Sequence, residues 1–352
     1  MKKDSNKPVA APGKKSKLSD VSTLAGVSVA TVSRVINSPG AVRKVLRDKV
    51  ELAMAELNYI PDAAARALSS RRMNTIGAIM PTLSTAIFSE WVVALQNRLD
   101  AAGFSLLISS SEYSPDTEFK ALTSFLNRGV DGVILTGSNH LPASYALLQQ
   151  HNIPALCSFT HDCGGELPCV GFDHRQAMRE LADYLVRIGH REIGVITSPL
   201  THNDRLQARI VGIRDALASV GAALPPERLI EVPYSVEEGR NAFNHLMASH
   251  PGITAVMCTT DMLAVGALLE ANRLGYEVPQ HVSITGFDDL ELIRHMLPPL
   301  TSVKSPSRLI GEQCADAIVG LVTGKPAVIA DIFTQPVIRA SSAKPRAKAG
   351  KR

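Results

Sequence analysis

Two periodicities divide the chain. Apolar side chains recur at helical spacing in residues 18–60, and strand-like apolar runs alternate with amphipathic stretches after residue 73. The first region predicts three short helices, over 20–25, 29–36 and 44–57. Ser19 and Ser28 are expected to cap the first two helices, and Gly26 suits the tight turn between them. Two short helices joined by a tight turn and braced by a third are typical of an all-α helix-turn-helix headpiece.

The outward face of the second predicted helix is small and polar. In a helix-turn-helix unit this helix enters the DNA major groove, so we expect its outward residues to meet DNA. They are Ser28, Val29, Ala30, Thr31, Ser33, Arg34 and Asn37. Val29 and Ala30 suit contact with a thymine methyl group, and Arg34 can reach a guanine or a phosphate. The alternative is a plain three-helix bundle with a solvated Arg34. The inward faces are expected to hold Val21, Leu24, Val32, Val35, Ile36, Val50, Leu52, Ala53, Ala55 and Leu57.

Residues 61–72 form a basic linker after the predicted headpiece of residues 18–60. Pro61 ends the third helix and suits the first position of another. The alanine-rich run 62–70 is too short to hold as an isolated helix, so we expect it to fold against a partner copy or on DNA. Leu68 near its end is the kind of residue that a minor-groove wedge requires. A flexible linker with an incidental leucine is the alternative.

The region 73–340 predicts an α/β body of two doubly wound subdomains. The apolar runs expected as buried parallel strands are 75–80, 105–110, 132–137, 153–159, 192–197, 253–259 and 282–287. Amphipathic stretches such as 90–102 and 118–127 separate them and predict helices. A ligand belongs at the carboxyl ends of such strands, in the cleft between the subdomains.

Polar side chains gather after these strands. They include Thr82, Ser84, Phe88, Thr136, Ser138, Phe159, Thr160, Asp173, Arg205, Arg209, Tyr234, Thr260, Asp261, Asp288 and Asp289. Carboxylates, hydroxyls, arginines and aromatic faces together suit a polyhydroxylated ligand such as a sugar or sugar acid. Each has a plain alternative when taken singly, since Asp261 could cap a helix and Asp288 or Asp289 could cap a turn.

Charge separates the same regions. Residues 1–72 carry a net charge of +8, residues 341–352 carry +5, and the body carries −9. A basic module on an acidic body indicates that only the module meets a polyanion. We expect residues 1–17 and 341–352 to be disordered basic tails. The start lacks the apolar core of a secretory signal, and no apolar run approaches the ~20 residues that span a membrane.

The five cysteines are Cys157, Cys163, Cys169, Cys258 and Cys314, and none forms a CxxC pair. The first three are spaced six apart with His161 between them, which would allow a metal site. Inert thiols in a reducing cytosol are the favoured interpretation, so the sequence predicts no metal and a cytoplasmic protein.

Enzyme motifs are missing from the sequence. There is no GxGxxG, GxSxG or HExxH, and the Gly-Lys at 324–325 lacks the remaining P-loop residues. We therefore expect no catalysis and no cofactor. A periplasmic solute-binding protein would share the cleft but not the headpiece, and an architectural DNA-binding protein would not need so large a body.

The stretch "LSDVSTLAGVSVATVSRVINSPGAV…AMAELNYIPDAAARAL" resembles the headpiece and hinge of the lac repressor family, and the resemblance runs from Leu18 to about Arg339. It implies a homodimer on a near-palindromic operator, with Leu68 of paired hinge helices inserted at a central step. It implies that Val29 and Ala30 select the operator sequence, with support from Arg34, Asn58, Tyr59 and Ala65. Arg43 departs from the Ser or Thr that often caps the third helix in this family.

The body carries "VGFD", "ARIVG", "TTDMLAVGALLEA" and "ITGFDD…PPLTSVK", which resemble the family's regulatory domain with its periplasmic-binding-protein-like subdomains. The resemblance implies a repressor of a metabolic operon, switched by an effector. The effector contacts we predict are Ser84, Phe88, Thr136, Thr160, Asp173, Arg209, Tyr234, Thr260 and Asp288. Thr260 departs from a common Asn, and Ser305 from a frequent Gln or Arg. The last residues contain no leucine heptads, so we expect a dimer.

Overall fold

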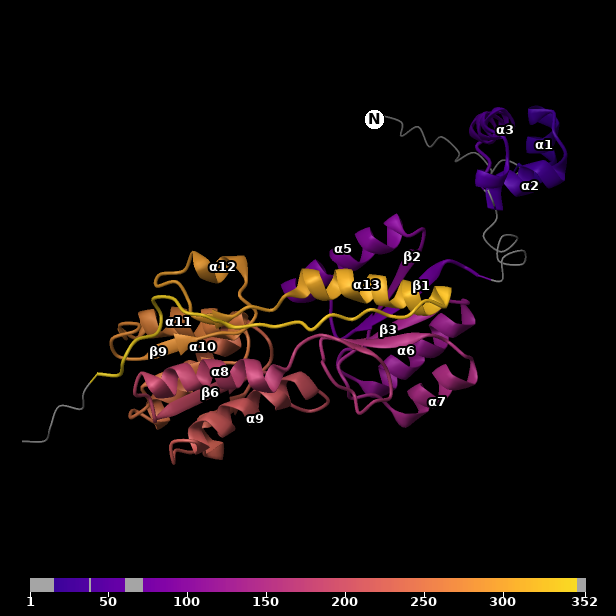
Figure 1. The fold of residues 1–352 in the computed structure, drawn as a ribbon. Coiled ribbons are helices and arrows are strands. Elements are labelled where there is room, and N and C mark those ends of the chain that lie inside the picture. Colours follow the sequence, from indigo (N-terminus) through magenta and orange to yellow (C-terminus); the bar gives the residue numbers. More distant parts are fainter. Residues whose placement is uncertain (1–15, 38, 61–71, 347–352) are drawn as a thin grey trace, which may run out of the picture. The chain divides into compact units, whose positions relative to one another are not determined.

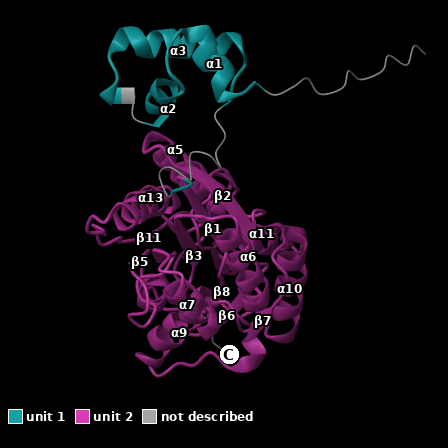
Figure 2. Cartoon of the chain, turned by 90° about the vertical axis from the view of Figure 1, so that its right-hand side faces the viewer, with its two compact units in different colours: residues 1–73 teal, residues 74–352 magenta. Residues whose placement is uncertain are grey.

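The computed structural model describes residues 16–37, 39–60 and 72–346 of the chain. It divides into two compact units, Met1–Met73 and Asn74–Arg352 (Figure 2). The predicted hinge run 62–70, with Ala65 and Leu68, lies outside the described residues. Each unit is described by itself.

The first unit is a three-helix headpiece. Its helices are α1 (Leu18–Ala25), α2 (Val29–Asn37) and α3 (Lys44–Glu56), with the short 3-10 turn η1 (Pro39–Ala41) before α3. Five residues from all three helices form its buried core: Val21, Val32, Val35, Val50 and Ala53. Gly26 takes a left-handed φ of 64°, which lets the chain turn sharply from α1 into α2.

Two predicted core leucines of the headpiece are on its surface. Leu24 is 45% exposed and Leu52 is 70% exposed. On α1 the buried stripe passes through Leu18 and Val21 to Ala25, and Leu24 lies about 100° away from it. On α3 the stripe runs from Val50, and Leu52 is two residues, or about 200°, from its start. Ala55 is likewise exposed.

The structure confirms one of the two predicted N-terminal helix caps. The Ser28 hydroxyl accepts a hydrogen bond from the Thr31 N–H at 3.1 Å, as a capping serine does. Ser19 was expected to cap the first helix, but α1 begins earlier, and Lys17 is its first boundary residue. The Lys17 N–H donates to the Asp20 carboxylate at 2.8 Å. Lys17 and Ser16, expected in the N-terminal tail, therefore contact the headpiece, since Ser16 Oγ also donates to the Leu57 carbonyl.

The second unit contains two parallel sheets, each with helices packed around it (Figure 1). The first sheet has the order β2-β1-β3-β4-β5. Its strands are β1 (Thr75–Met80), β2 (Ser105–Ser110), β3 (Gly132–Thr136), β4 (Ala155–Ser158) and β5 (Cys169–Val170). Its helices are α5 (Ala86–Ala101), α6 (Pro115–Asn127), α7 (Pro142–Gln150) and α13 (Ser307–Thr323). The predicted buried strand at 105–110 is half exposed, because β2 is an edge strand.

The second sheet has the order β7-β6-β8-β9. Its strands are β6 (Ile193–Thr197), β7 (Leu229–Glu231), β8 (Ala255–Cys258) and β9 (Ser283–Thr285). Its helices are α8 (His174–Arg187), α9 (Asp204–Ala218), α10 (Val236–Ser249) and α11 (Asp261–Arg273), with η2 (Pro226–Arg228) before β7 and α12 (Glu291–Arg294) after β9. Both strand orders reverse direction next to the first strand of the sheet, which makes a topological switch point in each subdomain.

The chain crosses between the two subdomains three times. It passes from β5 into α8, returns from β9 through β10 (Ser302–Val303) to α13, and crosses again through β11 (Pro336–Val337), which pairs antiparallel with β10. Figure 1 shows α13 lying beside α5 in the first subdomain. Among the described residues, no helix combines the length and the apolar character that crossing a membrane requires.

The end of the described chain is fastened to the second subdomain. Ser341 is fully buried, and its hydroxyl donates to the Ile284 carbonyl at 2.6 Å and accepts from the Thr301 N–H at 2.8 Å. The Ala343 carbonyl accepts from His190 at 2.8 Å. Residues 341–343 were expected in a disordered tail, and these hydrogen bonds place them in the folded body instead.

Candidate functional site

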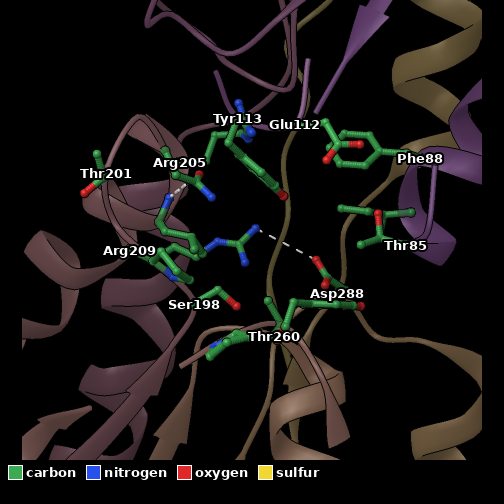
Figure 3. A pocket seen from close by; sticks show the side chains of 16 residues that line it. Thr85, Phe88, Glu112, Tyr113, Ser198, Thr201, Arg205, Arg209, Thr260 and Asp288 are labelled. Carbon is green, nitrogen blue, oxygen red and sulfur yellow. Dashed lines mark hydrogen bonds and ion pairs between the residues drawn. The ribbon is translucent and has the colours of Figure 1, made fainter. Parts of the chain in front are cut away.

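A cavity of about 370 Å³ lies in the body at the carboxyl ends of strands from both sheets (Figure 3). Residues after β1 and β2 line it from the first subdomain, and residues after β6, β7, β8 and β9 line it from the second. The lining residues are Thr85, Ile87, Phe88, Glu112, Tyr113, Ser198, Pro199, Thr201, Asn203, Arg205, Leu206, Arg209, Pro233, Tyr234, Thr260 and Asp288. The cleft between doubly wound subdomains is where such folds hold ligands.

Arg209 of α9 is one of two buried arginines that line this cavity, and Arg205 is the other. The Arg209 side chain lies 3.5 Å over the Phe287 ring, and its Nη1 donates to the Thr259 carbonyl at 2.5 Å. Burial lowers the pKa of the guanidinium to about 10, which still leaves it charged at neutral pH. These contacts hold the guanidinium in one position, and its remaining N–H donors face the cavity.

His174 fixes the position of Arg209 through a hydrogen bond. Its Nε2 lies 3.0 Å from the Phe159 carbonyl, so Nε2 carries the proton, and Nδ1 accepts from Arg209 Nε at 3.3 Å. Burial first, and then the charge of Arg209, push the pKa of His174 well below its ordinary value. A neutral imidazole at this point adds no charge beside the buried guanidinium.

Asp288 faces Arg209 across the cavity, with Oδ1 3.8 Å from Nη2 (Figure 3). Burial raises the pKa of this carboxyl to about 8, while Arg209 opposes the shift and Asp261 adds to it. Asp288 Oδ1 has no hydrogen-bond partner within the described part of the chain. Its φ of 120° is a conformation that residues with side chains seldom adopt, and such strain collects at functional sites.

Two further buried acids hold the Asp288 loop in place without lining the cavity. Asp261 accepts hydrogen bonds from the Leu290 N–H and the Ser302 hydroxyl, each at 2.7 Å. Asp289 pairs with Arg294 at 2.9 Å and with Arg339 at 2.5 Å. Asp261 was weighed as a helix cap, but its side chain bonds to this loop instead, so both acids stabilise the turn that presents Asp288.

Three hydroxyls around the cavity are buried and lack partners among the described residues. They belong to Thr85, Ser198 and Thr260. A buried hydroxyl without a hydrogen bond costs about 1–3 kcal/mol. Together with Asp288, these groups provide donors and acceptors from both subdomains that a polar ligand can satisfy.

Glu112 and Tyr113 close the cavity from the first subdomain. Both have positive φ values, of 53° and 58°, in the loop after β2. Burial raises the pKa of the Tyr113 hydroxyl, so this residue acts as a hydrogen-bonding phenol at neutral pH. Arg205 lies opposite, with Nη1 3.1 Å from Asp204, whose carboxylate also accepts from the Ser138 N–H at 2.8 Å.

The structure brings five of the nine predicted effector contacts to the cavity, namely Phe88, Arg209, Tyr234, Thr260 and Asp288. The other four do not line it. Thr136 donates to the Ile79 carbonyl inside the sheet, and Thr160 donates to the Asp162 carbonyl in its own turn. Ser84 pairs with Thr82 on the surface, and Asp173 caps α8 by accepting from the Gln176 N–H.

Several residues that line the cavity were not identified in the sequence analysis. Glu112 and Tyr113 follow β2, and Ser198, Thr201 and Asn203 follow β6. They obey the same rule as the predicted residues, because they stand at the carboxyl ends of strands. Applying that rule to all strands alike would have included them.

The headpiece presents the predicted DNA-facing residues on α2. Val29, Ala30, Arg34 and Asn37 are exposed, and Thr31 and Ser33 are half-buried. Two hydrogen bonds within α2 and its cap order this face: the Ser28 and Thr31 hydroxyls are 2.9 Å apart, and Asn37 donates to Ser33 at 3.3 Å. Asn58 is exposed with a φ of 47°, whereas Tyr59 is half-buried against the headpiece core.

α3 starts without a side-chain cap. Arg43 is its N-cap residue, and no side-chain hydrogen bond is present there. Its exposed face carries ion pairs one turn apart, between Lys44 and Asp48 and between Arg47 and Glu51. Such surface pairs contribute little to stability.

Comparisons with known proteins match both units. Residues 17–62 match the family described as bacterial regulatory proteins, lacI family. Residues 73–341 match periplasmic binding proteins and the sugar binding domain of the LacI family. The regulator GntR of Pseudomonas aeruginosa strain PAO1 is 33% identical over 309 residues, which cover 88% of this chain and 90% of that protein.

Solved structures agree over nearly the whole length. A LacI-family regulator from Silicibacter pomeroyi superposes with a TM-score of 0.84 at 27% identity, covering 94% of this chain and 99% of that one. The lac repressor dimer bound to operator and the anti-inducer ONPF superposes with a TM-score of 0.81 at 29% identity, covering 94% and 100%. This chain therefore belongs to the LacI family of bacterial regulatory proteins.

Proposed function

We propose that this chain is a homodimeric transcriptional repressor whose affinity for a near-palindromic operator changes when a small molecule occupies the cavity. The exposed face of α2 supplies the operator contacts, through Val29, Ala30 and Arg34. The operator-bound lac repressor dimer, similar over 94% of this chain, supports this role. The hinge residues Ala65 and Leu68 belong to the proposal through the family resemblance alone.

We infer that the effector is a sugar or a sugar acid. The observation that carries this inference is the set of buried polar groups around the cavity that have no hydrogen-bond partner among the described residues, Thr85, Ser198, Thr260 and Asp288. A molecule with several hydroxyls can satisfy all four, and Arg205 and Arg209 suit a carboxylate on it. Phe88 and Tyr234 offer apolar faces for its ring.

The chain is proposed to act by binding and not by catalysis. Asp288 and Arg209 oppose each other across the cavity, and the protein needs no cofactor for a switch of this kind. Binding that favours one arrangement of the two subdomains changes operator affinity by a coupling free energy of about 1–3 kcal/mol, and operator binding changes effector affinity by the same factor. A regulator of this kind works in the bacterial cytoplasm, where the operator is.

A thermal-shift screen of the purified full chain against sugars, sugar acids and small carboxylates tests the effector assignment. A ligand at 100 times its Kd should raise the free energy of unfolding by about 2.7 kcal/mol. The shift should vanish in Arg209→Ala and persist in Arg179→Ala, whose arginine lies on the outer face of α8 and is 44% exposed. A ligand whose shift survives Arg209→Ala would bind elsewhere and contradict the assignment.

Operator binding with and without that ligand tests the switch. Fluorescence anisotropy of a labelled operator should give a several-fold to about hundred-fold change in Kd. A rise in Kd makes the ligand an inducer, and a fall makes it a co-repressor, because the sign follows the state that the ligand prefers. An unchanged operator Kd at saturating ligand would contradict the proposed switch.

A further inference from the structure

Three cysteines come together in the first subdomain, away from the cavity. Cys157 on β4 and Cys169 on β5 are register partners on adjacent parallel strands, and Cys163 belongs to the loop between those strands. Their three sulfur atoms all lie within 4.8 Å of one another. Cys163 Sγ and Cys169 Sγ are 2.9 Å apart. The sheet pairing therefore assembles a thiol cluster from positions that are six residues apart in sequence.

A buried histidine lies next to Cys157 of this cluster. His140, in the loop before α7, has its Nε2 3.6 Å from Cys157 Sγ. Its Nδ1 lies 2.8 Å from the Glu118 carboxylate, which is itself buried on α6. His161, the histidine between these cysteines in the sequence, is half exposed and lies 3.8 Å from Asp173. The imidazole beside the cluster therefore comes from a different loop, and it was not identified in the sequence analysis, which favoured inert thiols and no metal.

The arrangement matches the donor set of a tetrahedral zinc site. Three sulfurs and one imidazole bind Zn²⁺ with Zn–S distances of about 2.3 Å, which place the sulfurs about 3.8 Å apart. A ligating histidine usually donates its other N–H to a carboxylate, as His140 would to Glu118. We propose that Cys157, Cys163, Cys169 and His140 bind one divalent thiophilic cation of the Zn²⁺ class. Binding requires Cys163 and Cys169 to separate by about 1 Å, which the Cys163 loop can supply. It also requires His140 Nε2 to turn from the Gly137 carbonyl toward the sulfurs, because the ligand atoms that already lie within 4.8 Å of one another are the three sulfurs alone.

The site adjoins the contact between the two subdomains. His140 Nε2 lies 3.0 Å from the Gly137 carbonyl, and a cation at Nε2 takes away this hydrogen bond. A Cβ added at Gly137 would come within 2.2 Å of Arg205 Nη1, so this backbone lies directly against the cavity arginine. The Ser138 hydroxyl also donates to the Asp204 carboxylate at 3.0 Å.

Occupancy of the cation site is therefore expected to alter ligand affinity at the cavity. This coupling rests on the proposed function, whereas the cation site itself does not.

Metal retention by the untagged full chain tests the site. Reduced protein is mixed with excess Zn²⁺, desalted and analysed for metal, and Co²⁺ serves as a spectroscopic probe because thiolate ligation gives it strong visible absorption. We expect one Zn²⁺ per chain. Cys163→Ser and Cys169→Ser should each weaken Zn²⁺ binding by at least about 100-fold, and Glu118→Gln by about 10–100-fold. Cys314→Ser is the matched control, since Cys314 is a buried thiol on α13 outside the cluster.

Three results would overturn the proposal. One is equal Zn²⁺ retention in wild type and in the double variant Cys163→Ser/Cys169→Ser. Another is a Co²⁺ complex that lacks thiolate absorption. A third is air-exposed protein that loses two thiols and two hydrogens in mass, and that after reduction still binds no Zn²⁺, which would make the cluster a disulfide pair. Circular dichroism spectra establish that each variant is folded, so a failed fold is not mistaken for a lost site.

The coupling is tested apart from the site. Effector Kd is measured by titration of the chain with and without one equivalent of Zn²⁺, in wild type and in Cys163→Ser. A change in wild type alone supports the coupling. Zn²⁺ bound with no change in Kd overturns the coupling and leaves the site standing, while failure of the effector assignment itself shows in the Arg209→Ala experiment.

Discussion

The two units of the chain present their candidate binding groups in opposite ways. On α2 of the headpiece, Val29 is 46% exposed and Arg34 is exposed as well. In the body, Arg209 and Asp288 are only 4% and 6% exposed. Groups on an open helix face can be exchanged with little effect on folding. A buried carboxyl such as Asp288, whose Oδ1 has no hydrogen-bond partner in the described chain, costs stability until a ligand satisfies it.

The cores of the two units differ as strongly. Five buried residues form the headpiece core, while dozens form the cores of the body. A single buried valine is therefore a large share of what holds the headpiece together. The comparison predicts that headpiece stability fails with one core change, and that the body tolerates changes at its binding groups.

The largest expected effect comes from Val32→Asp in the headpiece core. Val32 is fully buried, and an ionised carboxylate there has no partner, so we expect the headpiece to unfold and operator binding to be lost. Differential scanning calorimetry should show the melting of the body unchanged. The matched control is Leu52→Asp, at a 70% exposed position of α3, which should change stability by no more than about 0.5 kcal/mol. A fall in the melting temperature of the body would show that the two units do not fold separately.

A smaller effect is expected from Arg34→Ala. Loss of a bidentate arginine–guanine contact costs about 1–3 kcal/mol, so operator Kd should rise by roughly 5-fold to 150-fold, while headpiece melting stays the same. Arg34→Lys separates two roles of the charge. It restores affinity if Arg34 meets a phosphate, and it does not if Arg34 reads a guanine, because lysine lacks the planar fork. Unchanged affinity in Arg34→Ala would remove this residue from the operator interface.

The sequence predicted seven of the strands in their order along the chain and gave no prediction of which strands pair. All seven apolar runs contain strands. Six of these strands are buried on both faces, which leaves an unbroken apolar signature, whereas β2 is a half-exposed edge strand. The assignment of cavity residues was less complete. Thr136 ends β3 and Tyr113 follows β2, yet Thr136 bonds within the sheet and Tyr113 lines the cavity. Strand order and side-chain direction decide between them, and both depend on contacts between residues far apart in sequence.

The thiol cluster likewise depends on contacts between residues far apart in sequence. The spacing of Cys157, Cys163 and Cys169 is visible in the sequence, but His140 joins them only because the loop before α7 meets the end of β4. The sequence also does not show that the last described residues are bound to the body. Ser341 reads as part of a basic tail, and only its two hydrogen bonds to the second subdomain reveal its role.

Asp288→Asn tests how much the buried carboxyl lowers the free energy of unfolding, because that contribution depends on pH. The pKa of about 8 lies above the ordinary value of 3.8, so between these pH values unfolding releases a proton. Wild-type stability should therefore fall as pH rises from about 4 to about 8, and the variant should lack this slope. Each unit of pKa displacement corresponds to about 1.4 kcal/mol, so we expect the variant to gain at least about 1 kcal/mol over wild type between pH 5 and pH 9.

Urea denaturation at the two pH values measures this difference. The neighbouring variant Asp289→Asn is the control, because Asp289 is paired with Arg294 and Arg339 and its loss should destabilise at both pH values. Equal stability of wild type and Asp288→Asn across this range would show that Asp288 is not held as a buried acid.

The smallest expected change in stability comes from Thr260→Val. We compare it with Ser341→Ala, because the Thr260 hydroxyl is assigned to ligand binding and the Ser341 hydroxyl stabilises the fold. Thr260 Oγ1 is buried without a hydrogen-bond partner in the described chain, so Thr260→Val should leave the unliganded protein equally stable or up to about 1 kcal/mol more stable. Ser341→Ala removes a hydroxyl with two hydrogen bonds and should cost about 1–3 kcal/mol. Ligand binding should respond in the opposite order, with a weaker Kd in Thr260→Val and an unchanged Kd in Ser341→Ala. If Thr260→Val destabilises the free protein as much as Ser341→Ala does, the Thr260 hydroxyl is already satisfied, and one of the four groups that assign the cavity to a polyhydroxylated ligand is lost.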